Sequence, residues 1–241
     1  MCTDILGFRR NALLGFYVVM FAGMAISGIV AIWLKRTYSK YSKLKSNSGM
    51  SGAQVARAIL DRNGLTNVPV EPVAGQLTDH YDPSRKIVRL SEGNFGSNSI
   101  AAASVAAHEV GHAIQDASGY VPMKLRSGIV PIVNFSNQLF MPLLFGGFIL
   151  GGFSGQGGLG QTLVLAAAAV FMAVFAFHVV TLPVEINAST RAYGQLTRYG
   201  FLSSSEAAGT KRVLSAAAMT YIAAALTSLL MVVYLLLAAR E

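Results

Sequence analysis

One short stretch of the sequence holds residues whose types and spacing could do chemistry on a metal ion. His108-Glu109-Val110-Gly111-His112 follows the pattern His-Glu-x-x-His. In a helix, residues four apart lie on the same face, so both imidazoles can reach one ion. Glu109 is turned away from that line and can take a proton from water at the ion. The pattern therefore predicts a zinc site with His108 and His112 as ligands and Glu109 as general base.

A catalytic zinc ion usually takes three protein ligands and keeps one position open. Asp116 lies on the same stripe as the two histidines, but a helix carries it about 12 Å beyond His108. We therefore expect Asp116 beside the ligands and not among them. The residues alone leave three candidates for the third ligand. These are His80, His178 and Glu185, of which Glu185 is explained equally well as an interfacial carboxylate paired with Arg191 or Arg198.

Apolar runs long enough to cross a bilayer flank the motif. The chain is 53% hydrophobic and only 12% charged, a composition that is rare in soluble domains. Runs of about 20 apolar residues explain it, because that length spans the hydrocarbon core. We predict transmembrane helices over residues 11–34, 129–153, 161–182 and 213–239.

Basic residues indicate how these helices are oriented. Five follow the first apolar run, and Arg9 and Arg10 precede it; the five are Lys35, Arg36, Lys40, Lys43 and Lys45. Because positive charge marks the cytoplasmic side, segments 35–127 and 183–212 are both expected there, at one surface of the plasma membrane. The net charge of +8 is then explained by orientation and anionic lipid, and no nucleic-acid partner is expected.

Within the first polar segment, two helices are predicted. Ser51 is expected to cap a helix over residues 52–62. Ser97 or Asn98 is expected to cap a second helix, over residues 99–117, and this helix carries the motif. The metal site is therefore expected at the membrane surface and outside the apolar runs.

Two short strands complete this segment. Residues 68–73 read as a strand that Pro69 and Pro72 would confine to a sheet edge. Residues 86–90 read as a second strand. That second strand either pairs within the sheet or adds an extended peptide substrate along its edge.

Several blocks of the sequence resemble the neutral zinc metallopeptidases of bacterial membranes, the YugP-like family. The blocks are residues 50–53, 77–83, 88–91, 107–116 and 182–189. With the apolar runs, the resemblance covers most of the chain. It implies a mainly α membrane protein with about four transmembrane helices and a cytoplasmic α+β, zincin-like catalytic region. It also implies one catalytic Zn²⁺ ion and a gluzincin type of metallopeptidase.

The resemblance extends to individual residues. Glu185 stands in the block that supplies the family's third zinc ligand, and Asp79, His80 and Tyr81 stand in a block that belongs to the site region. Thr190 stands where a basic residue is expected. This departure leaves the ligands intact but changes what the helix of Glu185 contacts.

On this interpretation the reaction is hydrolysis of peptide bonds in membrane-associated or misfolded proteins. A second donor to the oxyanion is expected from His80, Tyr81, Arg191 or Tyr193. Asp79 and Asp116 are expected to support the ligands from behind.

Two other functions remain open. A non-catalytic scaffold stabilised by zinc would need a fourth protein ligand, such as His80. A transporter would need ionisable residues near mid-membrane, but the predicted spans carry almost none apart from His178.

Overall fold

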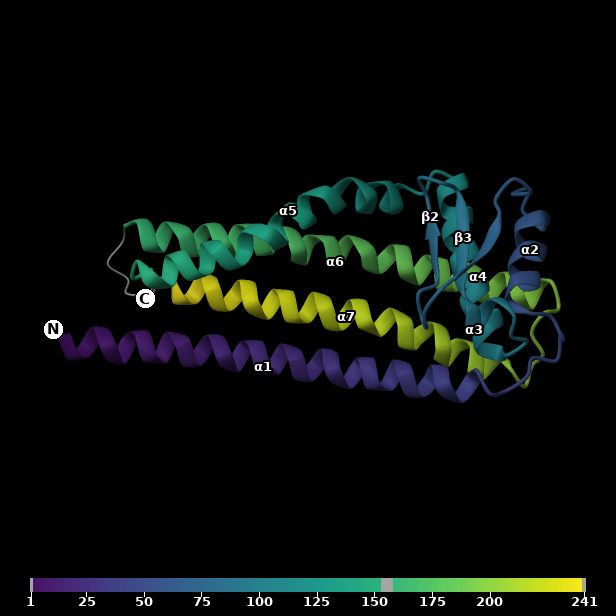
Figure 1. Cartoon of the computed structure of the whole chain (residues 1–241), viewed down its shortest axis with the longest axis horizontal. Coiled ribbons are helices and arrows are strands. Elements are labelled where there is room, and N and C mark those ends of the chain that lie inside the picture. Colours follow the sequence, from purple (N-terminus) through teal and green to yellow (C-terminus); the bar gives the residue numbers. More distant parts are fainter. Residues whose placement is uncertain (1, 153–157, 240–241) are drawn as a thin grey trace. The chain divides into compact units, whose positions relative to one another are not determined.

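The protein is mainly helical and contains one small sheet (Figure 1). The computed structural model describes the backbone of residues 2–152 and 158–239, and the side chains of residues 14–152 and 158–239. The elements in chain order are α1 (Cys2–Tyr41), α2 (Gly52–Arg62), β1 (Val70–Val73), β2 (His80–Asp82), β3 (Ile87–Ser91), α3 (Glu92–Phe95), α4 (Ile100–Ala117), α5 (Val121–Ile149), α6 (Leu159–Arg198) and α7 (Ala207–Ala238).

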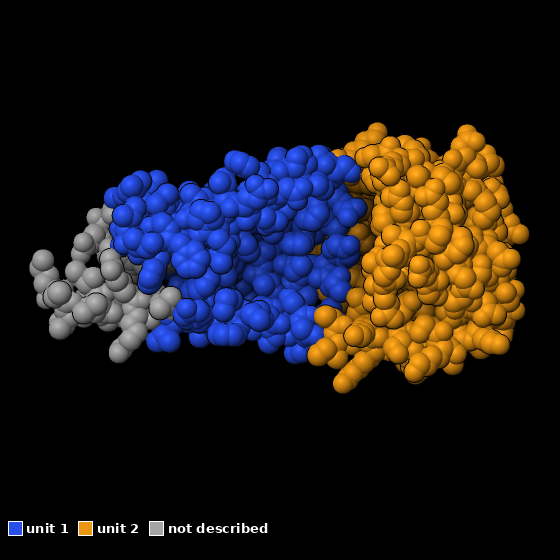
Figure 2. All heavy atoms as spheres, viewed as in Figure 1, with its two compact units in different colours: residues 1–30, 125–181, 220–241 blue, residues 31–124, 182–219 orange. Residues whose placement is uncertain are grey.

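Among the described residues, four helices are long and apolar enough, by length and composition, to cross a membrane. They are α1 from Leu14 onward, α5, α6 and α7. The chain divides into two compact units (Figure 2). Unit 1 comprises residues 1–30, 125–181 and 220–241, and unit 2 comprises residues 31–124 and 182–219.

Unit 1 carries its apolar side chains largely on its surface. Val18, Phe21 and Ile149 are each 60% exposed or more, at 67%, 60% and 72%. Within the unit, Leu144, Val164 and Leu235 belong to one buried cluster of α5, α6 and α7. An apolar exterior around a packed interior is what contact with lipid requires.

Helix α5 differs from the second predicted span, which was placed at residues 129–153. It begins earlier, at Val121, and ends at Ile149; residue 153 lies outside the described residues. Pro131 and Pro142 lie inside this helix and do not end it. A proline in a helix removes one donor and clashes with the preceding turn, but neighbouring helices can compensate for that loss.

Unit 2 begins with the capped helix α2. The side chain of Ser51 accepts a hydrogen bond from the N–H of Gln54, and the Gln54 side chain accepts one from the N–H of Ser51. This reciprocal capping box fixes the start of the helix. The predicted helix at residues 52–62 is confirmed.

The sheet has the strand order β1-β3-β2. β1 pairs with β3 in parallel, and β2 pairs with β3 in antiparallel register. β1 is an edge strand, as its prolines predicted. β3 is central and paired on both sides, so the alternative of pairing within the sheet is confirmed and that of adding a peptide along its edge is wrong.

Helix α4 packs on the sheet and on α2. Its N-cap is Ser99, whose side chain accepts from the N–H of Ala102, so the predicted caps at Ser97 and Asn98 are one or two residues early. Nearly the whole helix is buried. Small residues such as Ala103, Ala106 and Ala107 face the core that α4 shares with α2, β3 and α6.

Candidate metal centre

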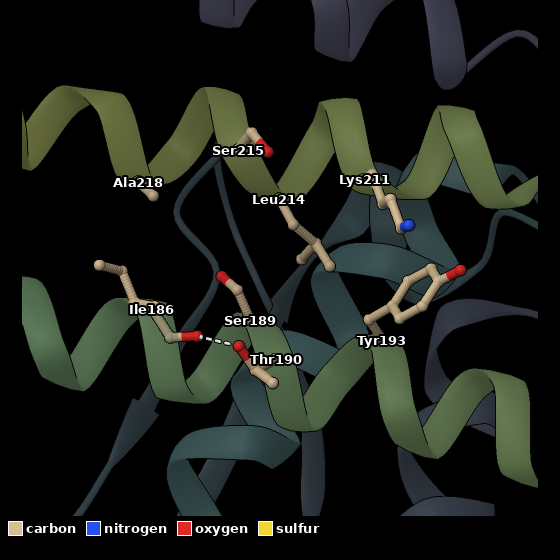
Figure 3. A pocket seen from close by; sticks show the side chains of 8 residues that line it. All are labelled: Ile186, Ser189, Thr190, Tyr193, Lys211, Leu214, Ser215 and Ala218. Atoms are coloured by element: carbon tan, nitrogen blue, oxygen red, sulfur yellow. Dashed lines mark hydrogen bonds between the residues drawn. The ribbon is translucent and has the colours of Figure 1, made fainter.

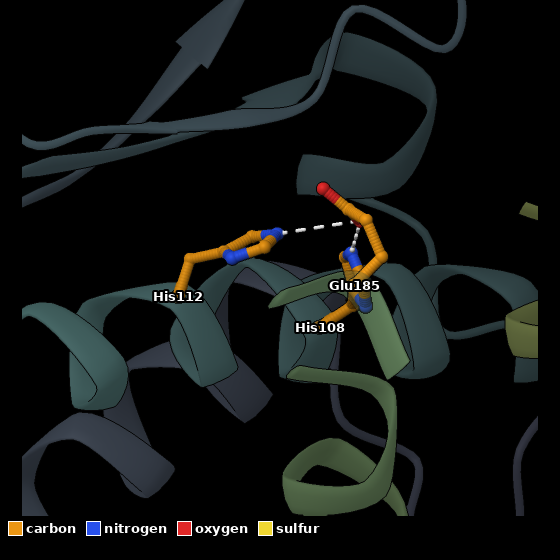
Figure 4. Close-up of side chains that lie close together, drawn as sticks. All are labelled: His108, His112 and Glu185. Carbon is orange, nitrogen blue, oxygen red and sulfur yellow. Dashed lines mark hydrogen bonds and ion pairs between the residues drawn. The ribbon is translucent and has the colours of Figure 1, made fainter. Parts of the chain in front are cut away.

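Three side chains meet on facing parts of α4 and α6. Nε2 of His108 lies 3.2 Å from Oε2 of Glu185, and Nε2 of His112 lies 3.6 Å from the same oxygen. Figure 4 shows both imidazoles directed at the carboxylate. All three residues are buried, and one ligand atom from each lies within 4.8 Å of the others. We refer to His108, His112 and Glu185 as the His-His-Glu cluster.

The donor set and its geometry fit a zinc ion. Two imidazole nitrogens and a carboxylate oxygen are ligands that catalytic zinc takes. Ligands of tetrahedral zinc at about 2.0–2.1 Å lie roughly 3.3 Å apart, and the separations of 3.2 and 3.6 Å are close to that value. Within the part of the chain that the structure describes, no fourth His, Cys, Asp or Glu joins the cluster. The cluster therefore leaves a coordination position for water or substrate.

Glu109 lies on the same turn of α4 but outside the cluster. It is 7% exposed. Burial raises the pKa of its carboxyl, an effect that His108 and His112 oppose and that Glu185 and Asp79 reinforce. A carboxylate in such surroundings holds a proton more readily than one in water does.

The ring of His112 is held on its far side by Gln115. The two residues lie on one face of α4, and Nδ1 of His112 donates to Oε1 of Gln115 at 3.0 Å. The amide nitrogen of Gln115 donates to the carbonyl of Val184 at 2.8 Å and to Oδ1 of Asn187 at 3.0 Å. Gln115 is fully buried. It joins the ligand helix α4 to the turn of α6 that carries Glu185.

Gln115 was not expected from the sequence. A signal was available, because a residue three positions after His112 lies on the same helical face. Asp116 was expected to support the ligands, but its carboxylate is bonded to other residues. It accepts a hydrogen bond from the hydroxyl of Tyr81 at 2.7 Å and pairs with Lys86.

The ring of His108 also has a partner on its far side. Oγ of Ser189 lies 3.2 Å from Nδ1 of His108. The second ring nitrogens of both histidines are thus engaged, which leaves each Nε2 to point at Glu185. Gln115 holds a proton on Nδ1 of His112, and Ser189 helps to orient the ring of His108.

Ser189 also lines a pocket between α6 and α7 (Figure 3). The pocket has a volume of 330 Å³. Tyr193 forms part of its wall, with the ammonium of Lys211 lying 4.9 Å from the centre of the ring. Tyr193 is therefore held in this pocket and is not a member of the His-His-Glu cluster. Thr190 lines it too, and its hydroxyl donates back to the carbonyl of Ile186 at 2.8 Å.

The block at residues 79–81 divides between two faces of the sheet. Tyr81 faces the core, where burial and its bond to Asp116 raise the pKa of the hydroxyl. His80 is exposed on the other face, since successive residues of a strand alternate. Its Nδ1 lies 2.8 Å from the carbonyl of Thr78 and its Nε2 lies 3.5 Å from Arg89. The structure thus does not bring His80 into the cluster.

Asp79 and Arg191 each form hydrogen bonds with neighbouring side chains outside the His-His-Glu cluster. Asp79 accepts hydrogen bonds from the N–H and hydroxyl of Ser91 and from the amide of Asn94, at 2.7 to 3.0 Å. Arg191 donates to Oδ1 of Asn187 at 2.8 Å, the same oxygen that Gln115 contacts. Arg191 is thereby connected through Asn187 to Gln115, and Asp79 connects β3 to α3.

Comparison with known proteins identifies the group to which this arrangement belongs. Residues 16–240 match the family described as "Putative neutral zinc metallopeptidase". The chain belongs to this family. It is also 47% identical to the "Putative membrane protease YugP" of Bacillus subtilis (strain 168), over 214 residues that make up 89% of this chain and 92% of that protein. No solved structure matches the chain.

Proposed function

We propose that this protein is a membrane-bound zinc metallopeptidase of the gluzincin type, with one catalytic ion. The observation that carries the proposal is the His-His-Glu cluster with buried Glu109 beside it and no fourth protein ligand among the described residues. Membership of the zinc metallopeptidase family supports the same conclusion. A closed, four-ligand site would have favoured a zinc-stabilised scaffold.

Each residue has a distinct role in the proposed reaction. His108, His112 and Glu185 hold the ion, and Ser189 and Gln115 fix the two imidazoles. When bound, zinc supplies a Lewis acid that polarises a carbonyl and lowers the pKa of water towards about 7. Glu109 would take a proton from the attacking water and pass it to the leaving amine.

The edge strand β2 is the best candidate for holding an extended peptide. The N–H of Val88 donates to Pro69, on the β1 side of β3, at 3.0 Å. Val88 is the partner of Tyr81 in the antiparallel pair. Because hydrogen bonding alternates along such a pair, the N–H and C=O of Tyr81 point away from β3. They are available to add a substrate strand.

The proposed substrates are membrane-associated or misfolded proteins that reach the cytoplasmic face of the plasma membrane. Two features support this location. The four apolar helices indicate a membrane protein, and the basic residues at the end of the first apolar run indicate a cytoplasmic position for the polar segments. Both polar segments contribute to unit 2, which holds the cluster.

The test is cleavage of a casein-like or membrane-derived peptide mixture by the purified protein in detergent, with zinc counted in each sample. Glu109→Gln should keep its zinc and lose cleavage, while Glu185→Ala should lose both. Cleavage that survives Glu109→Gln would contradict the mechanism. Zinc without cleavage in the unmodified protein would favour the scaffold.

A further inference from the structure

A second pocket in unit 2 is lined by none of the residues of the His-His-Glu cluster. It lies between α1 and α7 and has a volume of 280 Å³; its lining residues are Trp33, Arg36, Thr37, Lys40, Tyr41 and Arg212. Arg36 and Lys40 come from α1 and Arg212 comes from α7. The fold thus gathers three positive charges from distant parts of the chain around one cavity.

These three cations have no acidic partner among the described side chains. The ion pairs found there involve other basic residues, namely Arg57, Lys86, Arg89 and the two histidines of the cluster. Lys40 only lies near the ring of Tyr41, with 5.6 Å from its ammonium to the ring centre. Like charges held together repel one another. An anion in the pocket would relieve that repulsion.

Packing beside the pocket holds α1 and α7 together. A Cβ built on Gly209 of α7 would lie 2.6 Å from Cε1 of Tyr41, so the helices touch at this point. Tyr38, Tyr41 and Val213 also share a buried cluster with α4. The positions of the three cations are therefore set by packed helices and not by a loop, and the pocket is preformed.

The position of the pocket along both helices indicates which anion it takes. The apolar run of α1 ends at Leu34, one residue after Trp33, and Arg212 directly precedes the apolar run of α7. Tryptophan is enriched where a helix leaves the bilayer core, and basic pockets between membrane helices bind lipid headgroups. We propose that this pocket binds the phosphate headgroup of an anionic phospholipid. Arg36, Lys40 and Arg212 contact the phosphate, and Trp33 lies on the acyl-chain side.

Trp33 provides a direct readout because it is the one tryptophan in the sequence. The full chain is reconstituted in phosphatidylcholine vesicles with increasing phosphatidylglycerol that carries brominated, fluorescence-quenching acyl chains. A mirror series uses brominated phosphatidylcholine. The anionic lipid should bind at Trp33 about 100-fold more tightly than phosphatidylcholine, because each of the three cations contributes about 1 kcal/mol. Arg36→Gln or Arg212→Gln should each lower that preference about fivefold, equivalent to about 1 kcal/mol.

Lys35→Gln is the matched control. This variant removes one positive charge from the residue directly before Arg36 in α1, but Lys35 does not line the pocket. It should keep the preference for the anionic lipid. If Lys35→Gln lowers the preference for the anionic lipid as much as Arg36→Gln does, the lipid is attracted by the overall charge of the helix end and the proposed site is wrong. Equal quenching by both brominated lipids would also contradict the site.

Two further measurements control for folding of the variants and for binding of a soluble phosphate. Circular dichroism shows whether each variant is folded, and Lys40→Gln replaces an arginine variant that is not. Millimolar glycerol 3-phosphate is added to the same vesicles to distinguish a lipid from a soluble phosphate. If quenching of Trp33 by the brominated anionic lipid persists, the lipid is the ligand. If glycerol 3-phosphate abolishes that quenching, the pocket prefers a soluble phosphate and the proposal is wrong.

Discussion

Gly111 of α4 lies against the main chain of α6 at Ala188, so closely that a Cβ built on Gly111 would come 2.7 Å from the Ala188 carbonyl oxygen. Gly111 precedes His112, a proposed metal ligand, and Ala188 lies one turn after Glu185. The absence of a side chain at Gly111 therefore sets the distance between the two ligand-bearing helices. Only glycine permits this approach without a shift of one backbone.

Substitution of Gly111 should disturb the metal site from behind. In Gly111→Ala the new methyl group forces α6 away from α4, which we expect to lower the free energy of unfolding by about 1–3 kcal/mol. Zinc affinity, measured by competition with a chelator, should fall as Glu185 moves from the histidines. Thermal melting in detergent measures the stability change.

The control for this variant is Gly194→Ala, in the same helix α6. A Cβ at Gly194 meets no atom within 4 Å, so alanine should leave zinc affinity unchanged and add about 0.5–1 kcal/mol of helix stability. Equal zinc affinity in Gly111→Ala and the unmodified protein would show that α4 and α6 adjust without moving the ligands.

The hydrogen bond from His112 to Gln115 gives a second prediction. Gln115→Leu removes the acceptor for Nδ1 of His112 and frees the ring to rotate, so zinc affinity should fall about 10- to 100-fold. Gln115→Glu keeps an acceptor at that position and should bind zinc more tightly than Gln115→Leu. Similar losses in both variants would mean that Gln115 acts through its contact with α6 at Val184.

Glu206 gives a prediction about pH. It accepts hydrogen bonds from the N–H groups of Asn47 and Ser203 at 2.9 and 2.8 Å. Burial disfavours the charged carboxylate, but the bonds from Ser203 and Asn47 outweigh that effect and hold the pKa of Glu206 below its usual value of 4.5. A group with a lowered pKa stabilises the fold above its unfolded-state pKa and loses that contribution as pH falls.

Accordingly, Glu206→Gln should destabilise the protein at neutral pH by about 1–3 kcal/mol. The difference from the unmodified protein should shrink as pH falls below 4.5, because Glu206 then becomes protonated as well. Melting curves over a pH series measure this difference in stability between the variant and the unmodified protein. Glu92→Gln, an exposed change in α3, should show no such difference, and a gap that stays constant with pH would exclude a role for the Glu206 charge.

Removal of zinc should expose the energetic coupling between the metal and the fold. An ion at a free concentration about 1,000-fold above its dissociation constant stabilises the folded state by about 4 kcal/mol. Dialysis against a chelator should therefore lower the melting temperature of the unmodified protein and of Glu109→Gln alike. Glu185→Ala, which lacks one ligand, should respond little; a response as large as that of the unmodified protein would argue against Glu185 as a ligand.

The sequence predicted best the features that are encoded locally. The capping box at Ser51 and Gln54 set the start of α2, and the spacing of His108 and His112 placed both rings on one face of α4. The resemblance to known peptidases predicted Glu185 as the third member of this site. In the structure, its carboxylate lies 3.2 Å from Nε2 of His108. Residue types and periodicity alone had left that position open.

Features set by contacts between distant segments were predicted poorly. β2 has three residues, too few for an alternating pattern, so His80 and Tyr81 could not be assigned to opposite faces of a sheet. The membrane span predicted at residues 161–182 was expected to end before Pro183, but Pro183 lies inside the single helix α6. The roles of Gln115 and Ser189 depend on the packing of α4 against α6, which no local pattern records.

The division of the chain has a consequence for the order in which the protein is made. Unit 2 is built from residues 31–124 and 182–219, and the mainly apolar stretch 125–181 lies between them. Since a ribosome delivers the chain from its N-terminus, His108 and His112 emerge before that stretch and Glu185 emerges after it. The cluster therefore stays incomplete until the intervening hairpin has been synthesised. A nascent chain that stalls before this point carries His108 and His112 but lacks Glu185, so it has the motif without the cluster.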